Sequence, residues 1–185
     1  MLSPRLILAL CLLGGDLGLL AAPVPQEAPD AAGAPASAWK PFQEFGFLLG
    51  SWTGTSESGK RIGGSVVQAS SELSGNYVSF RGMRLFPEQD GRAEETIEEI
   101  GTFYYDRDKR HYGAHLYFSS GVVGVYDVEV GSGMLKLTSR EIVNYEGARS
   151  RITLSKSQEG LLYIVDFAPP GKDFLPLFSA KLSRR

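Results

Sequence analysis

The sequence predicts an all-β fold: an antiparallel up-and-down barrel of about ten strands with a short N-terminal helix at one end. From Ser51 onward, apolar and polar residues alternate with a period of two, in segments of about eight to eleven residues. Gly, Asn, Asp and Ser separate these segments and supply the positive φ angles and side-chain caps that tight hairpins need. An open sheet of that many strands would leave long unpaired edges, so we expect it to close on itself.

Length and composition indicate one ordinary domain. The chain has 185 residues, of which 43% are hydrophobic and 22% charged, and its formal net charge is -2. That length allows one substantial core but hardly two. The charge balance gives no attraction to polyanions, so nucleic acid is not an expected partner.

The first 22 residues have the pattern of a signal peptide. Arg5 supplies a positive start, Leu6 to Leu13 form an apolar stretch, and Ala21 and Ala22 are the small residues at which a signal peptidase cuts. The alternative is a signal anchor, but the stretch is short for a membrane span and Asp16 interrupts it. We expect an exported protein, periplasmic or extracellular, with no integral membrane span after processing.

The single cysteine, Cys11, lies inside this leader. Leu8, Ala9 and Leu10 lack the small residue that lipoprotein processing needs directly before its cysteine, so full release is favoured over a lipid anchor. Removal of the leader would leave a mature chain without cysteine, hence without disulfides, thiolate metal sites or cysteine nucleophiles.

Residues 23–38 consist largely of Ala, Pro, Gly and Ser, a composition that predicts a disordered linker. The barrel domain is then expected over residues 39–185. At its start Phe42, Phe45, Leu48 and Leu49 recur at helical spacing behind a proline, which predicts a short helix with one apolar face.

Ten strands follow, each bounded by turn residues such as Asp90-Gly91 and Glu159-Gly160. They are predicted near Trp52 to Ser58, Ile62 to Leu73, Asn76 to Phe86, Glu94 to Tyr105, Arg110 to Ser119, Val122 to Val130, Met134 to Arg140, Ala148 to Lys156, Leu161 to Ala168, and Leu177 to Ser183.

The segment Gly50-Ser51-Trp52-Thr53-Gly54-Thr55-Ser56 resembles the Gly-x-Trp-x-Gly opening of calycin-type barrels, which include lipocalins, fatty-acid-binding proteins and nitrobindins. With the later turn Tyr104-Tyr105-Asp106-Arg107-Asp108 it is similar to bacterial exported proteins of unknown function that have a lipocalin-like barrel. The resemblance runs from about Phe42 to the C-terminus. It implies structural roles for Gly50, Trp52 and Gly54, with Trp52 closing the barrel floor and Gly54 allowing a close backbone approach.

Nitrobindin-like relatives bind haem through a histidine on one of their last strands, which raises a haem site as an alternative. Here the only histidines are His111 and His115, in mid-chain, and Ser56 replaces the third glycine of the longer nitrobindin opening. Four residues apart on a strand, the two imidazoles would be separated by about 13 Å, too far to share one metal ion. No cofactor is therefore expected.

Alternation predicts which side chains line the barrel. The apolar set on the strand after residue 110 includes Tyr112, Leu116 and Phe118, and later strands add Tyr126, Tyr163 and Phe167. A barrel of this size either fills itself with side chains or holds one small ligand, and alternation does not decide between the two.

Charged residues also point inward in any register. Arg81 and Arg84 fall on opposite faces of one strand, as do Glu98 and Glu99 on the next, so one of each pair must face the interior unless a bulge at Gly82 intervenes. One interpretation is an Arg–Glu ion pair across adjacent strands. The other is an arginine that anchors a ligand carboxylate, as calycin-type carriers often do.

No catalytic constellation stands out: there is no nucleophile elbow, and no histidine is spaced beside a Ser or Asp as in a triad. The sequence thus favours a binding protein over an enzyme. We expect an exported monomer or weak dimer that binds a small apolar or amphipathic molecule, with or without a carboxylate, through Arg81 or Arg84 and the apolar lining. The alternatives are an envelope protein-interaction module with a solidly packed barrel and a haem-binding nitrobindin-like protein.

Overall fold

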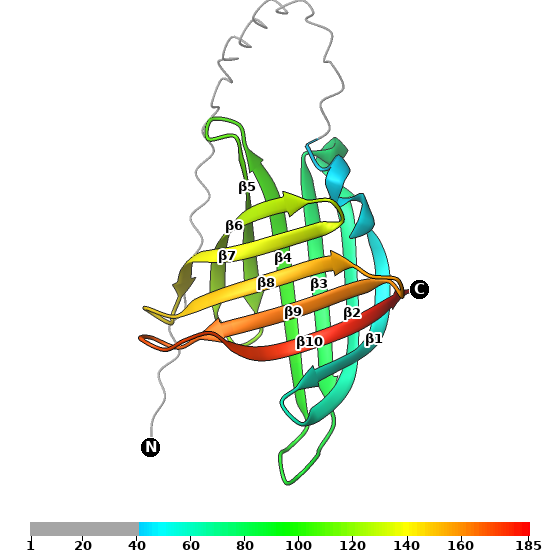
Figure 1. Ribbon diagram of the computed structural model, residues 1–185, viewed down its shortest axis with the longest axis vertical. Helices are drawn as coiled ribbons and strands as arrows, with labels where there is room; N and C mark the ends of the chain where they lie inside the picture. The colour runs from blue at the N-terminus through cyan, green and yellow to red at the C-terminus, as the bar shows by residue number, and fades with distance from the viewer. Residues whose placement is uncertain (1–40) are drawn as a thin grey trace, which may run out of the picture. The chain divides into compact units, whose positions relative to one another are not determined.

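The computed structural model describes residues 41–185, which form a closed antiparallel barrel of ten strands (Figure 1). The predicted signal peptide, the linker and Cys11 lie outside the described residues. So does the start of the predicted helix, and its described part forms the 3-10 helix η1, Gln43–Phe47.

Each strand pairs with its neighbours in the chain, and β1 pairs with β10 to close the barrel, with Trp52 opposite Arg184 and Glu57 opposite Ser179. A second 3-10 turn, η2 (Leu73–Gly75), joins β2 to β3. The strands are β1 (Gly50–Ser58), β2 (Arg61–Glu72), β3 (Tyr77–Phe86), β4 (Glu95–Asp106), β5 (His111–Phe118), β6 (Val123–Gly131), β7 (Met134–Val143), β8 (Arg149–Lys156), β9 (Leu161–Ala168) and β10 (Leu175–Arg184).

The predicted all-β fold and the ten strands are confirmed, although β1 begins two residues earlier than predicted, at Gly50, and the bounds of β7 and β10 also differ. In β7 the register with β6 shifts at Arg140, so the strand continues to Val143 where alternation alone ended it. In β10 the register with β9 shifts at Leu177, and the strand begins earlier, at Leu175. A bulge inserts one residue and interrupts the period of two, which is why the sequence pattern broke at these places.

One end of the barrel is closed by η1 and the residues around it. Phe45 and Leu48 are fully buried, and the Phe45 ring packs edge-on against Phe103 at 5.4 Å between centroids. Trp52 donates its indole N–H to the Leu48 carbonyl at 2.8 Å. Tyr112 donates its hydroxyl to the Pro41 carbonyl from the opposite wall. These aromatic contacts seal this end with apolar groups whose polar tips are all satisfied.

The glycines of the calycin-like opening serve the backbone. A Cβ at Gly54 would lie 2.0 Å from the Lys181 carbonyl oxygen, so only glycine allows β1 and β10 to approach this closely at the seam. Gly50 has a φ of 121°, a conformation that other residues rarely adopt. The predicted packing role of Trp52 agrees with its burial, at 6% exposure.

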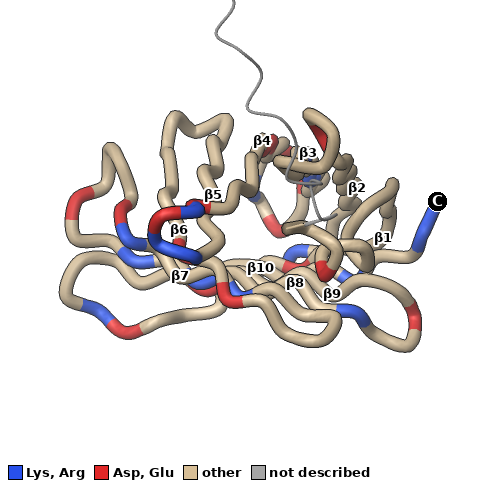
Figure 2. Tube along the Cα trace, turned by 90° about the horizontal axis from the view of Figure 1, so that it is seen from above, with Lys and Arg blue, Asp and Glu red and all other residues tan. Residues whose placement is uncertain are grey.

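Charged residues of both signs are interspersed along the strands and turns of the barrel (Figure 2). Three charged residues are buried: Arg61, Arg84 and Glu99. These residues lie toward the end of the barrel opposite η1.

Candidate functional site

A cavity of about 530 Å³ lies at the end of the barrel opposite η1. Most of its wall is apolar, and serines and one carboxylate lie toward its rim. Its lining residues are Ser58, Arg84, Phe86, Glu95, Thr96, Ile97, Phe118, Ser119, Ser120, Val122, Tyr126, Ile142, Ser150, Val165, Phe167, Leu177 and Phe178. A volume of that size is within the range of small-molecule sites.

Strand register shows how deep each wall residue lies. Arg84 is paired with Ile97 across β3 and β4, and the next inward-facing pair, further from the rim, is Gly82 with Glu99. Arg84 and Ile97 line the cavity, whereas Glu99 does not. Arg84 therefore forms part of the cavity floor, with Glu99 one layer behind it.

Both register shifts lie beside this cavity. The bulge at Arg140 lets Ile142 turn inward after Leu135 and Leu137, and Ile142 is 6% exposed and on the wall. The extra residue Leu177 in β10 also lines the cavity. The bulges thus shape the wall of the open end, as bulges at barrel rims commonly do.

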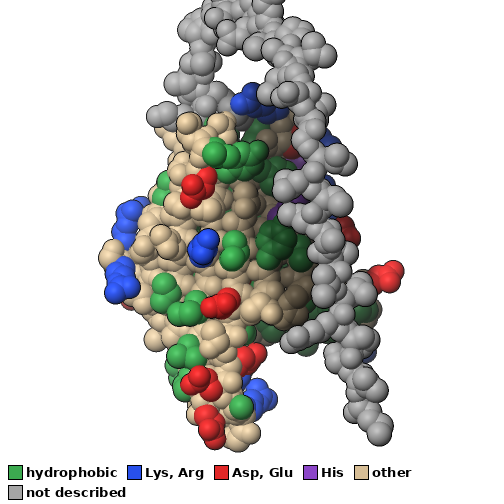
Figure 3. Space-filling view, turned by 180° about the vertical axis from the view of Figure 1, so that it is seen from behind, with side chains coloured by type: hydrophobic (Ala, Val, Ile, Leu, Met, Phe, Trp, Pro, Cys, Tyr) green, Lys and Arg blue, Asp and Glu red, His purple; other side chains and the backbone are tan. Residues whose placement is uncertain are grey.

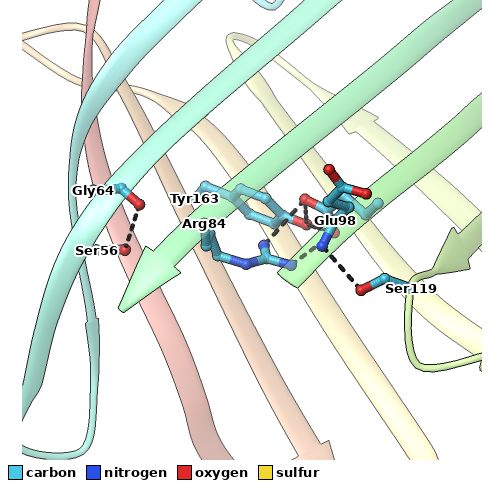
Figure 4. A network of polar contacts seen from close by, with 7 residues as sticks. Ser56, Gly64, Arg84, Glu98, Ser119 and Tyr163 are labelled. Atoms are coloured by element: carbon cyan, nitrogen blue, oxygen red, sulfur yellow. Dashed lines mark hydrogen bonds and ion pairs between the residues drawn. The ribbon is translucent and has the colours of Figure 1, made fainter. Parts of the chain in front are cut away.

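Arg84 on the floor forms a buried polar network with Glu99 and Tyr163 behind it, and Figure 4 shows the Arg84 and Tyr163 side chains side by side. Arg84 donates from Nη1 and Nη2 to the two Glu99 oxygens at 3.0 and 3.2 Å. The Tyr163 hydroxyl donates to the same carboxylate at 2.9 Å. The Arg84 guanidinium also lies over the Phe178 ring at 4.1 Å. Of the two interpretations of the inward arginine, the cross-strand ion pair is confirmed.

The surroundings of the network shift the pKa values of Tyr163 and Arg84. Burial, and then the charge of Glu99, raise the pKa of Tyr163 well above its ordinary value, so Tyr163 stays a hydrogen-bond donor. Burial is the largest single effect on Arg84 and lowers its pKa, but Glu99 and Tyr163 together outweigh burial, so the pKa of Arg84 is raised. On the cavity wall, burial raises the pKa of Tyr126, and Ser150 partly opposes that shift.

Gly82 makes the network possible. A Cβ built there would lie 2.2 Å from the Glu99 Oε1 atom, so any larger residue would displace the carboxylate. The predicted escape through a bulge at Gly82 is not used, because β3 and β4 stay in register through this residue.

A second buried arginine, Arg61, was not predicted. Its Nη1 donates to Glu95 at 2.6 Å, and its Nη2 donates to the carbonyls of Phe86 and Ala93 at 3.2 and 3.1 Å. Glu95 lies at the cavity rim with its side chain 52% exposed. Extending the inward alternation of β2 back from Val67 through Ser65 and Gly63 reaches Arg61, so the signal was present in the sequence.

The structure brings together only half of the predicted ligand-binding residues. Arg84, Phe118, Tyr126 and Phe167 line the cavity. The other four lie elsewhere: Arg81 faces outward, Tyr112 belongs to the η1 seal, Leu116 is in the packed core, and Tyr163 lies behind the floor bound to Glu99. Alternation gave the correct face for all but Arg81, which was one of two stated alternatives, but it carries no information on height along the barrel.

The two histidines do not reach the cavity. On β5 they alternate with the inward-facing Tyr112, Ala114 and Leu116, and neither belongs to the cavity wall. His111 lies 3.6 Å from Asp127, and the His115 ring packs edge-on against Tyr104. A histidine-ligated haem therefore does not fit this cavity. Within residues 41–185, no cluster of three or more His, Cys, Asp or Glu side chains is placed to hold a metal ion.

The outer face of β2–β5 carries several exposed apolar side chains among charged ones (Figure 3). They are Ile62, Val66, Met83, Leu85, Ile100 and Tyr117, each between 37% and 58% exposed. A shallow groove runs between them, with Arg81 and Glu98 also on its wall. We refer to this face as the β2–β5 outer patch.

Comparisons with known proteins support the fold alone. No family model matches the sequence, and no curated protein matches it. Among solved structures the chain is similar to one described as "Crystal Structure of Rv2717c from M. tuberculosis". The TM-score is 0.59 and the identity 16%, over 78% of this chain and 96% of that one. Among the described residues, no helix has the length and apolar character needed to cross a membrane.

Proposed function

We propose that this protein binds a small apolar or amphipathic molecule in the cavity opposite η1. The observation that carries the proposal is the contrast inside one barrel: the η1 half is filled by its own side chains, whereas the other half leaves about 530 Å³ unfilled. Protein interiors are normally close-packed, so a space of this size at an accessible rim is typical of a binding site.

The wall chemistry favours an apolar ligand body. Phe86, Ile142, Val165 and Phe178 are nearly fully buried yet contribute to the wall, and Phe118 and Phe167 add two more rings. Burial of apolar ligand surface against such groups stabilises a complex by about 25 cal/mol for each Å² removed from water. The serines at the rim suit a polar end that remains near solvent.

The test fills the cavity. Val165→Trp places an indole in the cavity, and Ile164→Trp adds the same group on the outer face of the same strand as a matched control. The probe is the neutral apolar fluorophore N-phenyl-1-naphthylamine, followed by its fluorescence gain. We expect Val165→Trp to weaken its binding at least about tenfold, and Ile164→Trp to leave the Kd unchanged.

Equal affinity of both variants for the probe would place binding outside the cavity and reject the proposal. Absence of binding to the wild-type protein, together with native mass spectra that show no copurified small molecule, would also reject it.

We further propose that the barrel is of the calycin type and that the protein is exported. The Gly-x-Trp-x-Gly opening at the η1 end and the N-terminal leader pattern support these two statements. Cell fractionation with a leaderless control would test export.

A second candidate, a protein-interaction module in the envelope, draws on the β2–β5 outer patch. That alternative assumes a solidly packed barrel, whereas this barrel contains a cavity. Met83→Glu would abolish partner capture under this second candidate and leave fluorophore binding unchanged under the first.

A further inference from the structure

We propose that the cavity floor selects a ligand whose deep end is a neutral hydrogen-bond acceptor, such as a ketone or ester carbonyl, and discriminates against a free carboxylate. This inference rests on the proposed binding function and specifies the ligand class for the same site. Three features of the floor support it: unused donors, a balanced charge and a fixed guanidinium plane.

Arg84 has donors left over. A guanidinium carries five N–H groups, and the bonds to Glu99 use one from each terminal nitrogen. The Nε–H is buried and has no acceptor among the described residues. Leaving such a donor unsatisfied costs free energy, which an acceptor on a ligand would recover. Ser65, the cross-strand neighbour of Arg84, likewise has a buried hydroxyl without a partner in the described part of the chain.

The floor carries no net charge. Arg84 is neutralised by Glu99 at 3.0 Å, and Tyr163 adds a neutral hydroxyl. At the rim, Glu95 is paired with Arg61 at 2.6 Å. A carboxylate entering the cavity would pass the half-exposed Glu95 and lose its hydration without meeting an uncompensated cation. A neutral carbonyl has a much smaller desolvation penalty and still gains a charge-assisted hydrogen bond.

The guanidinium is held in place before any ligand arrives. Phe178 stacks on it at 4.1 Å, Tyr163 lies at 5.7 Å, and the two bonds to Glu99 fix its plane. A donor whose orientation is already fixed loses little entropy on binding, so its contribution appears in the affinity.

The experiment compares three probes of matched length on the purified full-length protein: decan-2-one, decanoate and decane. Each is titrated against bound N-phenyl-1-naphthylamine at about pH 7.5, where the carboxylate is ionised. We expect decan-2-one to bind about tenfold more tightly than decane, and decanoate to bind more weakly than decan-2-one. Decanoate binding more tightly than the ketone would overturn the inference.

This result is separable from the proposed function. If decane and decan-2-one displace the fluorophore equally, the cavity binds apolar molecules but the floor does not select a carbonyl, and only the present inference fails. If no probe displaces it and the wild-type protein does not bind the fluorophore, the proposed function fails first.

Variants of the floor provide the second measurement. Glu99→Gln removes the charge that balances Arg84, so decanoate affinity should rise about tenfold relative to decan-2-one. Because this variant leaves a buried charge unpaired, its fold is checked first by circular dichroism.

The triple variant R84M/E99L/Y163F replaces the whole network by apolar groups, a change that proteins often tolerate. In this variant decan-2-one should bind no more tightly than decane, because the floor no longer offers a donor. Retention of that preference in the triple variant would also overturn the inference. Arg81→Met, on the outer face of the same strand, is the matched control and should change none of the three affinities.

Discussion

The two ends of this barrel are built from the same ten strands and differ in what fills them. At the η1 end, Phe45 of η1 and Leu48, which follows it, come from outside the strands and, with Trp52 of β1, close the space against Phe103 and Tyr112. At the opposite end no such segment enters among the described residues, and the lining rings are left around a cavity. The comparison teaches that closing a sheet does not by itself fill a barrel, because filling depends on one added segment.

The largest change in the free energy of unfolding is expected for a substitution at the η1 end. Phe45→Ala removes a fully buried ring from the seal and should lower the free energy of unfolding by about 4 kcal/mol. Phe118→Ala removes a ring that already borders open space, so its cost should be only about 1 to 2 kcal/mol. Urea unfolding of both variants measures the difference, and equal losses would break the distinction between the two ends.

A somewhat smaller effect is expected at the boundary between the ends. Glu99→Gln leaves Arg84 buried without its counter-charge and should cost about 3 kcal/mol in unfolding free energy. Glu98→Gln makes the same chemical change one residue earlier, on the exposed face, and should stay within about 0.5 kcal/mol of the wild type. A comparable loss at Glu98 would show that the network is not what stabilises this layer.

The smallest expected effect is on the pH dependence of the free energy of unfolding. The folded-state pKa of Tyr163 is raised above its ordinary value of 10.0, mainly by burial. The stability that the protonated hydroxyl contributes is therefore fully present below about pH 10 and is lost as pH rises from there toward the folded-state pKa. In Tyr163→Phe, the decline of stability above about pH 10 should be shallower by about one proton. Tyr117→Phe, at an exposed position, should decline like the wild type.

The fold could be predicted because its determinants are local. A period of two and turn residues such as Asp90-Gly91 mark each hairpin, and neighbours in the sequence became neighbours in the sheet. The Arg84–Glu99 pair was also within reach, since adjacent residues on a strand cannot both avoid the interior. Alternation along the strand did not show which of Arg81 and Arg84 faces the barrel interior. The register of β3 with β2 and β4 shows that it is Arg84.

The site itself was only partly within reach. Tyr112 and Phe118 share one face of β5, yet one belongs to the seal and the other to the cavity. The two residues lie at different heights along the barrel axis. That height depends on strand tilt and on where η1 packs, and a local sequence pattern contains information on neither. The bulges at Arg140 and Leu177 were not predicted for a related reason. An inserted residue interrupts the alternation of apolar and polar residues, and the same interruption is expected where a strand ends.

The seam between β1 and β10 has a consequence for assembly of the chain. The second partner of β1 is formed by residues 179–184 of β10, after all the other strands of the barrel. Among the strand pairs of residues 41–185, this one joins the segments that lie furthest apart in the sequence, so it has the largest loop-closure entropy cost. Residues 179–184 must leave the ribosome before the barrel can close, and until then a nascent chain presents two unpaired strand edges to its surroundings.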